Sequence, residues 1–197
     1  MKIAVLALQG AFIEHEQMLN HLGVETFEVR QLSDWQQPKD GLILPGGEST
    51  VQARLMRELG LLEPIRQDIL DGLPVFATCA GLILLARQED GKPRTGALGV
   101  MDIDVCRNAY GRQLGSFNAT APLRHNGQQT LQPMTFIRAP YVRRTLSPDV
   151  ETLAEVDGRI VAVKQGRQWA TAFHPELEDG TEFYRLLLAD FSSSFRF

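Results

Sequence analysis

The 197-residue chain lacks the features that mark several whole classes of protein. Its longest apolar run extends only from Ala80 to Ala86, whereas a membrane-spanning helix needs about 20 apolar residues. Its two cysteines, Cys79 and Cys106, are too few for a disulfide framework. It has no basic stripe and a formal net charge of −4, so we expect neither a membrane nor nucleic acid as a partner.

The composition that is present is typical of a globular protein. Hydrophobic residues make up 44% of the chain and charged residues 22%, which excludes extended disorder. The length favours a single domain over residues 1–197, with a tail at 192–197 that frays. The first residues fit a strand better than a signal peptide. We therefore expect a cytoplasmic protein whose cysteines are reduced thiols.

The first half of the sequence alternates short apolar runs with amphipathic segments. Ser49 and Gln52 have the spacing of a capping box, which predicts a helix start. Alternating strands and helices predict an α/β fold with a doubly wound, mostly parallel sheet. The predicted strands are 3–8, 24–29, 41–44 and 73–78, and the predicted helices are 12–22, 49–59, 64–71 and 80–87.

The second half has a different pattern, with alternating hydrophobic residues and turn signals. Asp157-Gly158 and Gln165-Gly166 predict hairpin turns, and a closing helix is expected at about 181–190. We therefore expect antiparallel strands and hairpins beside the parallel sheet. The segments that look extended are 101–105, 113–120, 134–142, 152–156, 160–164 and 168–173.

The strongest chemical signal surrounds Cys79, where a buried strand runs directly into a helix. Small residues stand two places before it and two places after it, at Ala77 and Gly81, which is the pattern of a nucleophile elbow. Such a corner holds a side chain at the carboxyl edge of the sheet, where open α/β sheets have their sites. A buried structural cysteine is the alternative, and it is the interpretation we adopt for Cys106.

A cysteine nucleophile needs a base, and His174 is the best placed of the four histidines. It follows a predicted strand, and Pro175 stiffens the chain after it. Glu176 is positioned to accept the second imidazole N–H and fix the tautomer. An exposed loop histidine is the alternative. His15 and His21 are expected on or near the solvent side of the first helix, and the histidines lack the spacing of metal ligands.

A glycine pair, Gly46-Gly47, lies between a predicted strand and a predicted helix. Such a loop can direct backbone N–H groups at an anion or an oxyanion. The lysine of a phosphate-binding loop is missing, so no phosphate site is predicted. An ordinary tight turn is the alternative interpretation.

Together, these segments resemble the class I, triad-type glutamine amidotransferases. The branch they are most similar to is the glutaminase subunit of pyridoxal 5′-phosphate synthase, because Ile83 stands where most other branches have glutamine. The similarity covers about residues 1–190, and only Ala77, in place of the usual glycine, departs from the pattern. The segments that carry it are 46–50, 78–86 and 173–176, supported by 7–12, 107–113 and 136–140.

The resemblance implies a flavodoxin-like fold and a role for each matching residue. Cys79 attacks the side-chain amide of L-glutamine, His174 transfers the proton and Glu176 orients the imidazole, so that a glutamyl thioester forms and is hydrolysed to glutamate. The backbone N–H groups of Gly47 and Ala80 meet the oxyanion. The residues implied to contact or frame glutamine are Gly47, Glu48, Ser49, Arg107, Ile137 and Arg138.

The resemblance also implies a partner that uses the ammonia. This is a (β/α)₈-barrel synthase subunit, in a large hetero-oligomer with a dodecameric synthase core, whose product is pyridoxal 5′-phosphate. No metal and no cofactor are expected in the glutaminase subunit itself. Two other functions stay open: a stand-alone γ-glutamyl cysteine hydrolase that needs no partner, and a non-catalytic interaction subunit.

Overall fold

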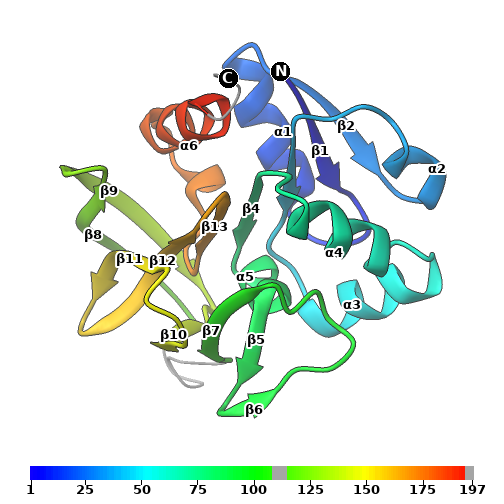
Figure 1. Ribbon diagram of the computed structural model, residues 1–197. Helices are drawn as coiled ribbons and strands as arrows, with labels where there is room; N and C mark the ends of the chain where they lie inside the picture. The colour runs from blue at the N-terminus through cyan, green and yellow to red at the C-terminus, as the bar shows by residue number, and fades with distance from the viewer. Residues whose placement is uncertain (108–114, 194–197) are drawn as a thin grey trace.

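A large mixed sheet forms the centre of the molecule (Figure 1). The computed structural model describes residues 1–107 and 115–193. Within them the sheet has 11 strands in the order β2-β1-β3-β4-β13-β12-β10-β7-β5-β6, and β11 pairs with β12. The order reverses at β1, which pairs with both β2 and β3.

Half of this sheet is parallel, as the sequence predicts. The order of its strands is that of a doubly wound, flavodoxin-like sheet, in which sites form at the carboxyl ends of the strands. The predicted α/β class is therefore confirmed. The parallel strands are β2 (Glu25–Val29), β1 (Lys2–Leu6), β3 (Gly41–Leu44), β4 (Val75–Thr78) and β13 (Gln168–Thr171).

The other half of the sheet is mainly antiparallel, with a parallel pairing between β5 and β7. The predicted hairpin turn at Asp157-Gly158 joins β11 to β12, and both of its residues have positive φ, 50° and 70°. The strands are β12 (Arg159–Gln165), β11 (Val150–Val156), β10 (Tyr141–Thr145), β7 (Met101–Cys106), β5 (Ala86–Glu89) and β6 (Lys92–Pro93).

A long hairpin forms a separate two-stranded sheet from β8 (Ser116–His125) and β9 (Gln128–Ile137). Its turn, Asn126-Gly127, has φ values of 50° and 74°, which fit the type I′ turn that twisted hairpins favour. The two strands are longer than the segments expected at 113–120 and 134–142, because they pair along their whole length. Residues 113 and 114 lie outside the described part of the chain.

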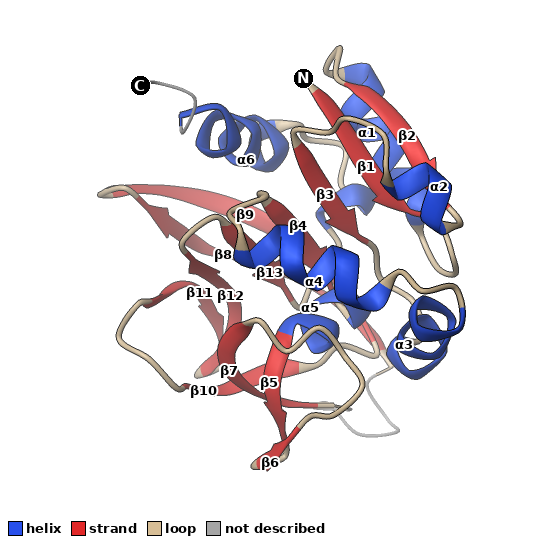
Figure 2. Ribbon diagram, turned by 45° about the vertical axis from the view of Figure 1, so that its right-hand side comes forward, coloured by secondary structure: helices blue, strands red, loops and turns tan. Residues whose placement is uncertain are grey.

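Helices cover both faces of the parallel strands, because successive side chains of a strand point to opposite faces. In β1, Ala4 and Leu6 face one apolar core, whereas Ile3 and Val5 face the other. Figure 2 shows α3 and α4 on one side of the sheet and α1 on the other. The first core is covered by α2 (Leu32–Trp35), α3 (Ser49–Glu58), α4 (Leu62–Leu70) and α5 (Ala80–Leu85), and the second by α1 (Phe12–His21), α6 (Glu182–Ser193) and the β8–β9 hairpin.

Several element boundaries differ from the sequence prediction, and three of them have a clear physical reason or bear on the site. The buried helix after Cys79 ends at Leu85 instead of residue 87, because Ala86 turns extended and β5 pairs with β7. The last helix continues through Ser193 instead of ending near residue 190, and residues 194–197 lie outside the described part of the chain. The cap of α3 is Glu48 instead of Ser49, because the Glu48 carboxylate accepts the N–H groups of Thr50 and Val51.

None of the helices in the described residues is long and apolar enough to cross a membrane.

Candidate active site

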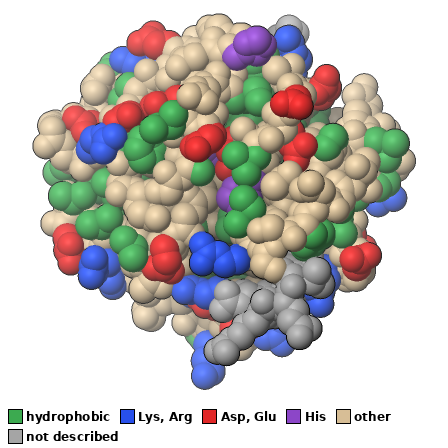
Figure 3. All heavy atoms as spheres, turned by 180° about the vertical axis from the view of Figure 1, so that it is seen from behind, with side chains coloured by type: hydrophobic (Ala, Val, Ile, Leu, Met, Phe, Trp, Pro, Cys, Tyr) green, Lys and Arg blue, Asp and Glu red, His purple; other side chains and the backbone are tan. Residues whose placement is uncertain are grey.

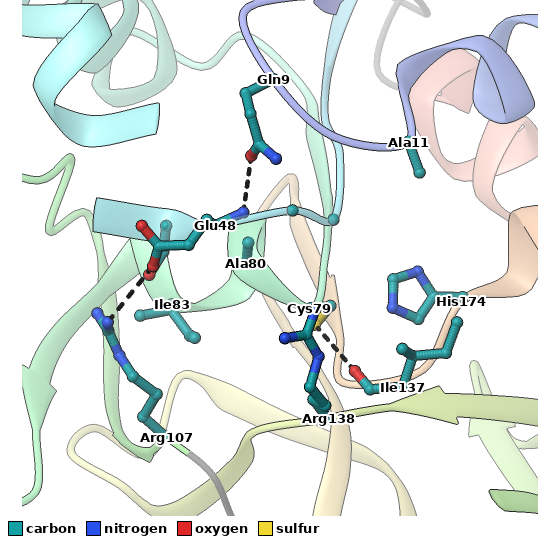
Figure 4. Close-up of a pocket in the computed structure, with 13 residues that line it drawn as sticks. Gln9, Ala11, Glu48, Cys79, Ala80, Ile83, Arg107, Ile137, Arg138 and His174 are labelled. Atoms are coloured by element: carbon teal, nitrogen blue, oxygen red, sulfur yellow. Dashed lines mark hydrogen bonds and ion pairs between the residues drawn. The ribbon is translucent and has the colours of Figure 1, made fainter. Parts of the chain in front are cut away.

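The loops that follow β1, β3, β4 and β13 meet at the carboxyl edge of the parallel strands. They enclose a cavity of about 300 Å³, shown in Figure 4. Every site residue predicted from the sequence lines this cavity except Glu176, which lies behind it. The predicted residues in its wall are Gly47, Glu48, Ser49, Cys79, Ala80, Arg107, Ile137, Arg138 and His174.

Cys79 occupies the sharp corner between β4 and α5. Its φ and ψ are 47° and −97°, a combination that a residue with a side chain adopts only at a cost of about 1–3 kcal/mol. The corner is held by the Cys79 N–H, which donates to Thr171 O at 2.8 Å. The predicted small residues are needed for space, because a Cβ at Gly81 would overlap Leu44 O and come within 3.1 Å of the Ala77 methyl. The methyl group of Ala77 can be accommodated at this corner because Gly81, which lies next to it, has no side chain.

His174 follows β13 and reaches Cys79 from the neighbouring strand. Its backbone N–H donates to Thr135 O at 2.9 Å, which fixes the loop against β9. The imidazole packs on the backbone of Gly46, since a Cβ at that residue would lie 2.5 Å from His174 Cε1 and 3.5 Å from Cys79 Cβ. The glycine thus leaves the room in which the imidazole and the sulfur lie side by side.

Glu176 lies in η1 (Pro175–Leu177), next to His174. The side chains of Cys79, His174 and Glu176 form a row, and we use that word for these three residues. Glu176 Oε1 is 2.6 Å from His174 Nδ1, a short distance typical of a charge-assisted hydrogen bond. With Nδ1 bound to the carboxylate, Nε2 is the ring nitrogen left for the sulfur. Cys79, His174 and Glu176 are all nearly excluded from solvent, at 8%, 6% and 6% exposure.

The electrostatics of the row favour an ion pair between His174 and Glu176. Burial opposes the imidazolium, but hydrogen bonds to Cys79 and Glu176 outweigh it and raise the pKa of His174 to about 10. Burial likewise opposes the carboxylate of Glu176, yet nearby His15 and the hydrogen bond from His174 keep its pKa below the usual value. At neutral pH the row therefore holds an imidazolium beside a carboxylate.

The glycine loop after β3 is tied to the loop after β1. Ala11 N donates to Gly46 O at 3.0 Å, and Glu48 N donates to the side-chain oxygen of Gln9 at 2.7 Å, as drawn in Figure 4. Gly47 has no space for a side chain, since a Cβ would lie 2.5 Å from that same Gln9 oxygen. Gln9 thus fixes the position of the loop and lines the cavity.

Two arginines extend into the cavity from the antiparallel half of the molecule (Figure 4). Arg107, directly after β7, pairs with Glu89 at 2.8 Å and with Glu48 at 3.7 Å. Arg138, directly after β9, is exposed and has a strained φ of 45°. In residues 1–107 and 115–193 no carboxylate pairs with Arg138, so its guanidinium is available to an anionic ligand.

Figure 3 shows the surface of the molecule from behind, relative to the view of Figure 1. A histidine side chain is visible in a hollow on this face, with Lys or Arg side chains below it. The described residues contain no group of three or more His, Cys, Asp and Glu side chains that could hold a metal ion. The reactive side chains in and beside the cavity are the thiol of Cys79, the imidazole of His174 and the carboxylate of Glu176.

One prediction about the histidines is wrong. His15 does not lie on the solvent side of α1 but is fully buried, and its Nε2 is 3.5 Å from Glu176 Oε1. Hydrophobic periodicity could not reveal this, because the hydrogen-bond partners of His15, Thr78 and Tyr184, lie on β4 and α6. Gln9 was also missed as a residue of the cavity, and its only signal was its place in the segment 7–12.

Comparison with known proteins identifies the family of this chain. The model of the SNO glutamine amidotransferase family matches residues 5–193. The chain belongs to this family. It is 56% identical to "Pyridoxal 5'-phosphate synthase subunit PdxT" of Methanocorpusculum labreanum, over 95% of this chain and 96% of that protein. It is 50% identical to the protein of the same name from Desulfitobacterium hafniense, over 98% of this chain and 94% of that protein.

Solved structures agree with the fold. A crystal structure of a glutamine amidotransferase superposes with a TM-score of 0.87 at 41% identity, covering 96% of this chain and 98% of that chain. The structure of PurLQS from Thermotoga maritima matches with a TM-score of 0.65 at 18% identity, covering 95% of this chain and 97% of that chain. At that identity the second likeness concerns the fold alone.

Proposed function

We propose that this chain, as one domain over residues 1–197, is the glutaminase subunit of a pyridoxal 5′-phosphate synthase. It hydrolyses L-glutamine to L-glutamate and ammonia. The observation that carries the proposal is the row Cys79–His174–Glu176 at a strained corner, in a chain 56% identical to a protein with that subunit's name. The cytoplasmic location stays a prediction from the sequence.

The row supports nucleophilic catalysis by Cys79. His174 Nε2 holds the proton of the Cys79 thiol while the sulfur attacks the side-chain amide carbon of glutamine, and it then gives this proton to the ammonia that leaves. Water then attacks the glutamyl thioester, with His174 as the base, and releases glutamate. Glu176 holds the imidazole through Nδ1, so the same nitrogen faces the reacting atoms in both steps.

The oxyanion of each tetrahedral intermediate is assigned to the backbone N–H groups of Gly47 and Ala80. Both residues line the cavity, on the two loops that flank Cys79. Ala80 is the first residue of α5, where a helix leaves its N–H groups without partners in the helix. Loss of one such donor typically costs about 3 kcal/mol of transition-state stabilisation.

The α-carboxylate of glutamine is assigned to Arg138. An arginine fork suits a carboxylate, and Arg107 is already partly neutralised by Glu89 and Glu48. We therefore assign Arg107 to the shape of the pocket wall, together with Glu48, Ser49 and Ile137. Glu48 is the cap of α3 and would also attract the amino group of glutamine by charge.

The proposed partner is a (β/α)₈-barrel synthase subunit in a hetero-oligomer with a dodecameric core. Ammonia released into water is protonated and lost as a nucleophile, so hydrolysis is useful only when it is coupled to a subunit that consumes the product. This predicts that activity depends on docking.

The deciding experiment measures ammonia release from glutamine by the purified chain, with and without the synthase subunit. We expect activity that rises on adding the synthase and is absent in Cys79→Ala. Strong turnover alone, with no response to the synthase, would favour a stand-alone γ-glutamyl hydrolase. Binding to the synthase without any ammonia release would favour an interaction subunit.

A further inference from the structure

A second histidine lies directly behind the row of reactive side chains. His15, on α1, is fully buried and contacts three polar groups from three other elements. Its Nε2 is 3.5 Å from Glu176 Oε1 and 3.2 Å from Thr78 Oγ1, and its Nδ1 is 2.6 Å from the Tyr184 hydroxyl. Thr78 is the residue before Cys79, so His15 contacts Glu176 and also the residue next to Cys79.

The partners of His15 determine its tautomer. Burial, reinforced by the charge of Glu176, keeps the pKa of Tyr184 well above 10, so its hydroxyl stays protonated and donates to Nδ1. Nε2 then carries the hydrogen, and it faces Thr78 and the carboxylate of Glu176, which accepts hydrogen bonds only. Burial lowers the pKa of His15 below its usual value, so the ring is neutral at pH 7.

The orientation of the ring is fixed by aromatic neighbours. His15 meets Phe76 edge-on at 6.0 Å between centroids and an angle of 76°, and Tyr184 at 6.2 Å and 62°. These contacts come from β4 and α6. A buried ring held in this way has little freedom to change its partner.

We propose that His15 is a positioning residue: its Nε2–H holds Glu176 so that Oε1 stays aimed at His174 Nδ1, and Tyr184 holds His15. The inference deepens the proposed glutaminase function and rests on it. Glu176 is in a nearly dry site, where a carboxylate without a neighbouring donor would be costly. His15 Nε2, at 3.5 Å, and His174 Nδ1, at 2.6 Å, both face the same oxygen of this carboxylate.

The charged and titratable groups that face this carboxylate come from each element packed against it. They are His174 before η1, His15 on α1 and Tyr184 on α6, with Cys79 acting through His174 and Glu14 acting through His15. A neutral His15 lowers the pKa of Glu176 through its Nε2–H, because the positive end of this bond faces the carboxylate at 3.5 Å and favours the charged form. Removing it therefore raises that pKa, and the acid limb of the kcat profile moves to higher pH.

The first test compares four variants in the complex with the synthase subunit. His15→Leu removes the donor, His15→Gln returns an N–H near the position of Nε2, and Tyr184→Phe removes only the hydroxyl that orients the ring. His21→Leu, on the exposed end of the same helix, is the matched control. We expect kcat to fall about tenfold to a hundredfold in His15→Leu and to fall less in Tyr184→Phe. In His15→Gln, part of the lost kcat should be recovered. In His21→Leu, kcat should be unchanged.

The pH profile separates positioning from packing. We expect KM for glutamine to stay within about twofold of wild type, because His15 does not line the cavity. The acid limb of kcat should move up by roughly half a unit to one unit in His15→Leu. A lower melting temperature with an unchanged kcat and an unchanged acid limb would overturn the proposal. If His15→Leu does not fold, the same comparison is made with Tyr184→Phe and His15→Gln.

The second test measures the reactivity of Cys79 in the absence of glutamine. Iodoacetamide alkylation of Cys79 in the chain alone is followed by mass spectrometry, with Cys106, the second free thiol, as the internal standard. We expect His15→Leu to slow alkylation of Cys79 severalfold near pH 6.5 and to leave Cys106 unchanged. Equal rates at Cys79 in wild type and variant would contradict the proposal. A wild type that alkylates normally but releases no ammonia with the synthase would instead contradict the glutaminase function.

Discussion

The parallel and antiparallel halves of the molecule contribute different things to one cavity. Cys79 and His174 follow parallel strands and are nearly buried, whereas Arg107 and Arg138 follow antiparallel strands and lie partly or fully at the surface. Loops at the carboxyl ends of parallel strands are held by strands on both sides, so they suit groups whose geometry must not vary. We therefore expect changes in the parallel half to alter kcat and changes in the antiparallel half to alter KM.

The two cysteines give the largest expected difference. Cys79→Ala should reduce glutamine hydrolysis about a millionfold, since the nucleophile is lost. Cys106→Ala should stay close to wild type, because Cys106 ends an antiparallel strand and does not line the cavity. Ammonia release in the presence of the synthase measures both, and synthase binding by Cys79→Ala is the control for folding. Appreciable turnover by Cys79→Ala would end the assignment of the nucleophile.

Glu176→Gln should be the next most severe change in the parallel half. The amide keeps the shape of the side chain but cannot stabilise the imidazolium, so we expect kcat to fall on the order of a thousandfold, less than in Cys79→Ala. KM should change little, since Glu176 does not line the cavity. Steady-state kinetics at several pH values measure the effect. A loss equal to that of Cys79→Ala would show that Glu176 does more than orient the ring.

The buried ion pair of the parallel half also predicts a dependence of stability on pH. The pKa of His174 is raised to about 10 in the folded chain, against about 6.5 when unfolded. A raised pKa stabilises the fold fully below the unfolded value, and this stabilisation is lost as the pH rises toward 10. Urea unfolding from pH 6 to 10 should show a loss on the order of a few kcal/mol that is reduced in His174→Gln. Parallel curves for the two proteins would exclude the ion pair.

The two arginines test the antiparallel half. Arg138→Gln should raise KM for glutamine about 10-fold to 100-fold, the effect of losing one charge-assisted pair, with kcat nearly unchanged. Arg107→Gln should raise it less, because Glu89 and Glu48 already engage that guanidinium. Steady-state kinetics of the two variants with glutamine measure both KM values. A larger effect at Arg107 would reassign the carboxylate contact to it.

The sequence predicted the parts of the site that depend on short segments. Cys79 was recognisable because its corner needs small neighbours two places away on each side. Its companion His174 was recognisable because a strand, a proline and a carboxylate stand next to it. These patterns are local, and the parallel sheet that brings the two loops together follows from the alternation of strands and helices.

The parts that were missed depend on contacts between distant segments. His15 was assigned to the wrong side of its helix because it is a polar residue, and its burial is satisfied by Tyr184, far along the chain on α6. The end of α5 at Leu85 is set by pairing of β5 with β7, which the apolar run from Ala80 does not encode. Similarly, Arg107 is engaged by Glu89 on a neighbouring strand.

The smallest expected effect concerns the boundary between the two halves, where Glu48 both caps α3 and pairs with Arg107. Burial opposes the charge of this carboxylate, but the hydrogen bonds that it accepts from the N–H groups of Val51 and Thr50 together outweigh burial and lower the pKa of Glu48. Glu48→Ala should destabilise the fold by about 1 kcal/mol, the usual cost of losing a helix cap. Glu48→Gln keeps an acceptor and should recover most of it, and the gap between wild type and Glu48→Gln should close as the pH falls and the carboxylate is protonated. Thermal unfolding of the three proteins at pH 7 and pH 4 measures this, and equal stability of Glu48→Ala and wild type at pH 7 would show that the cap contributes nothing.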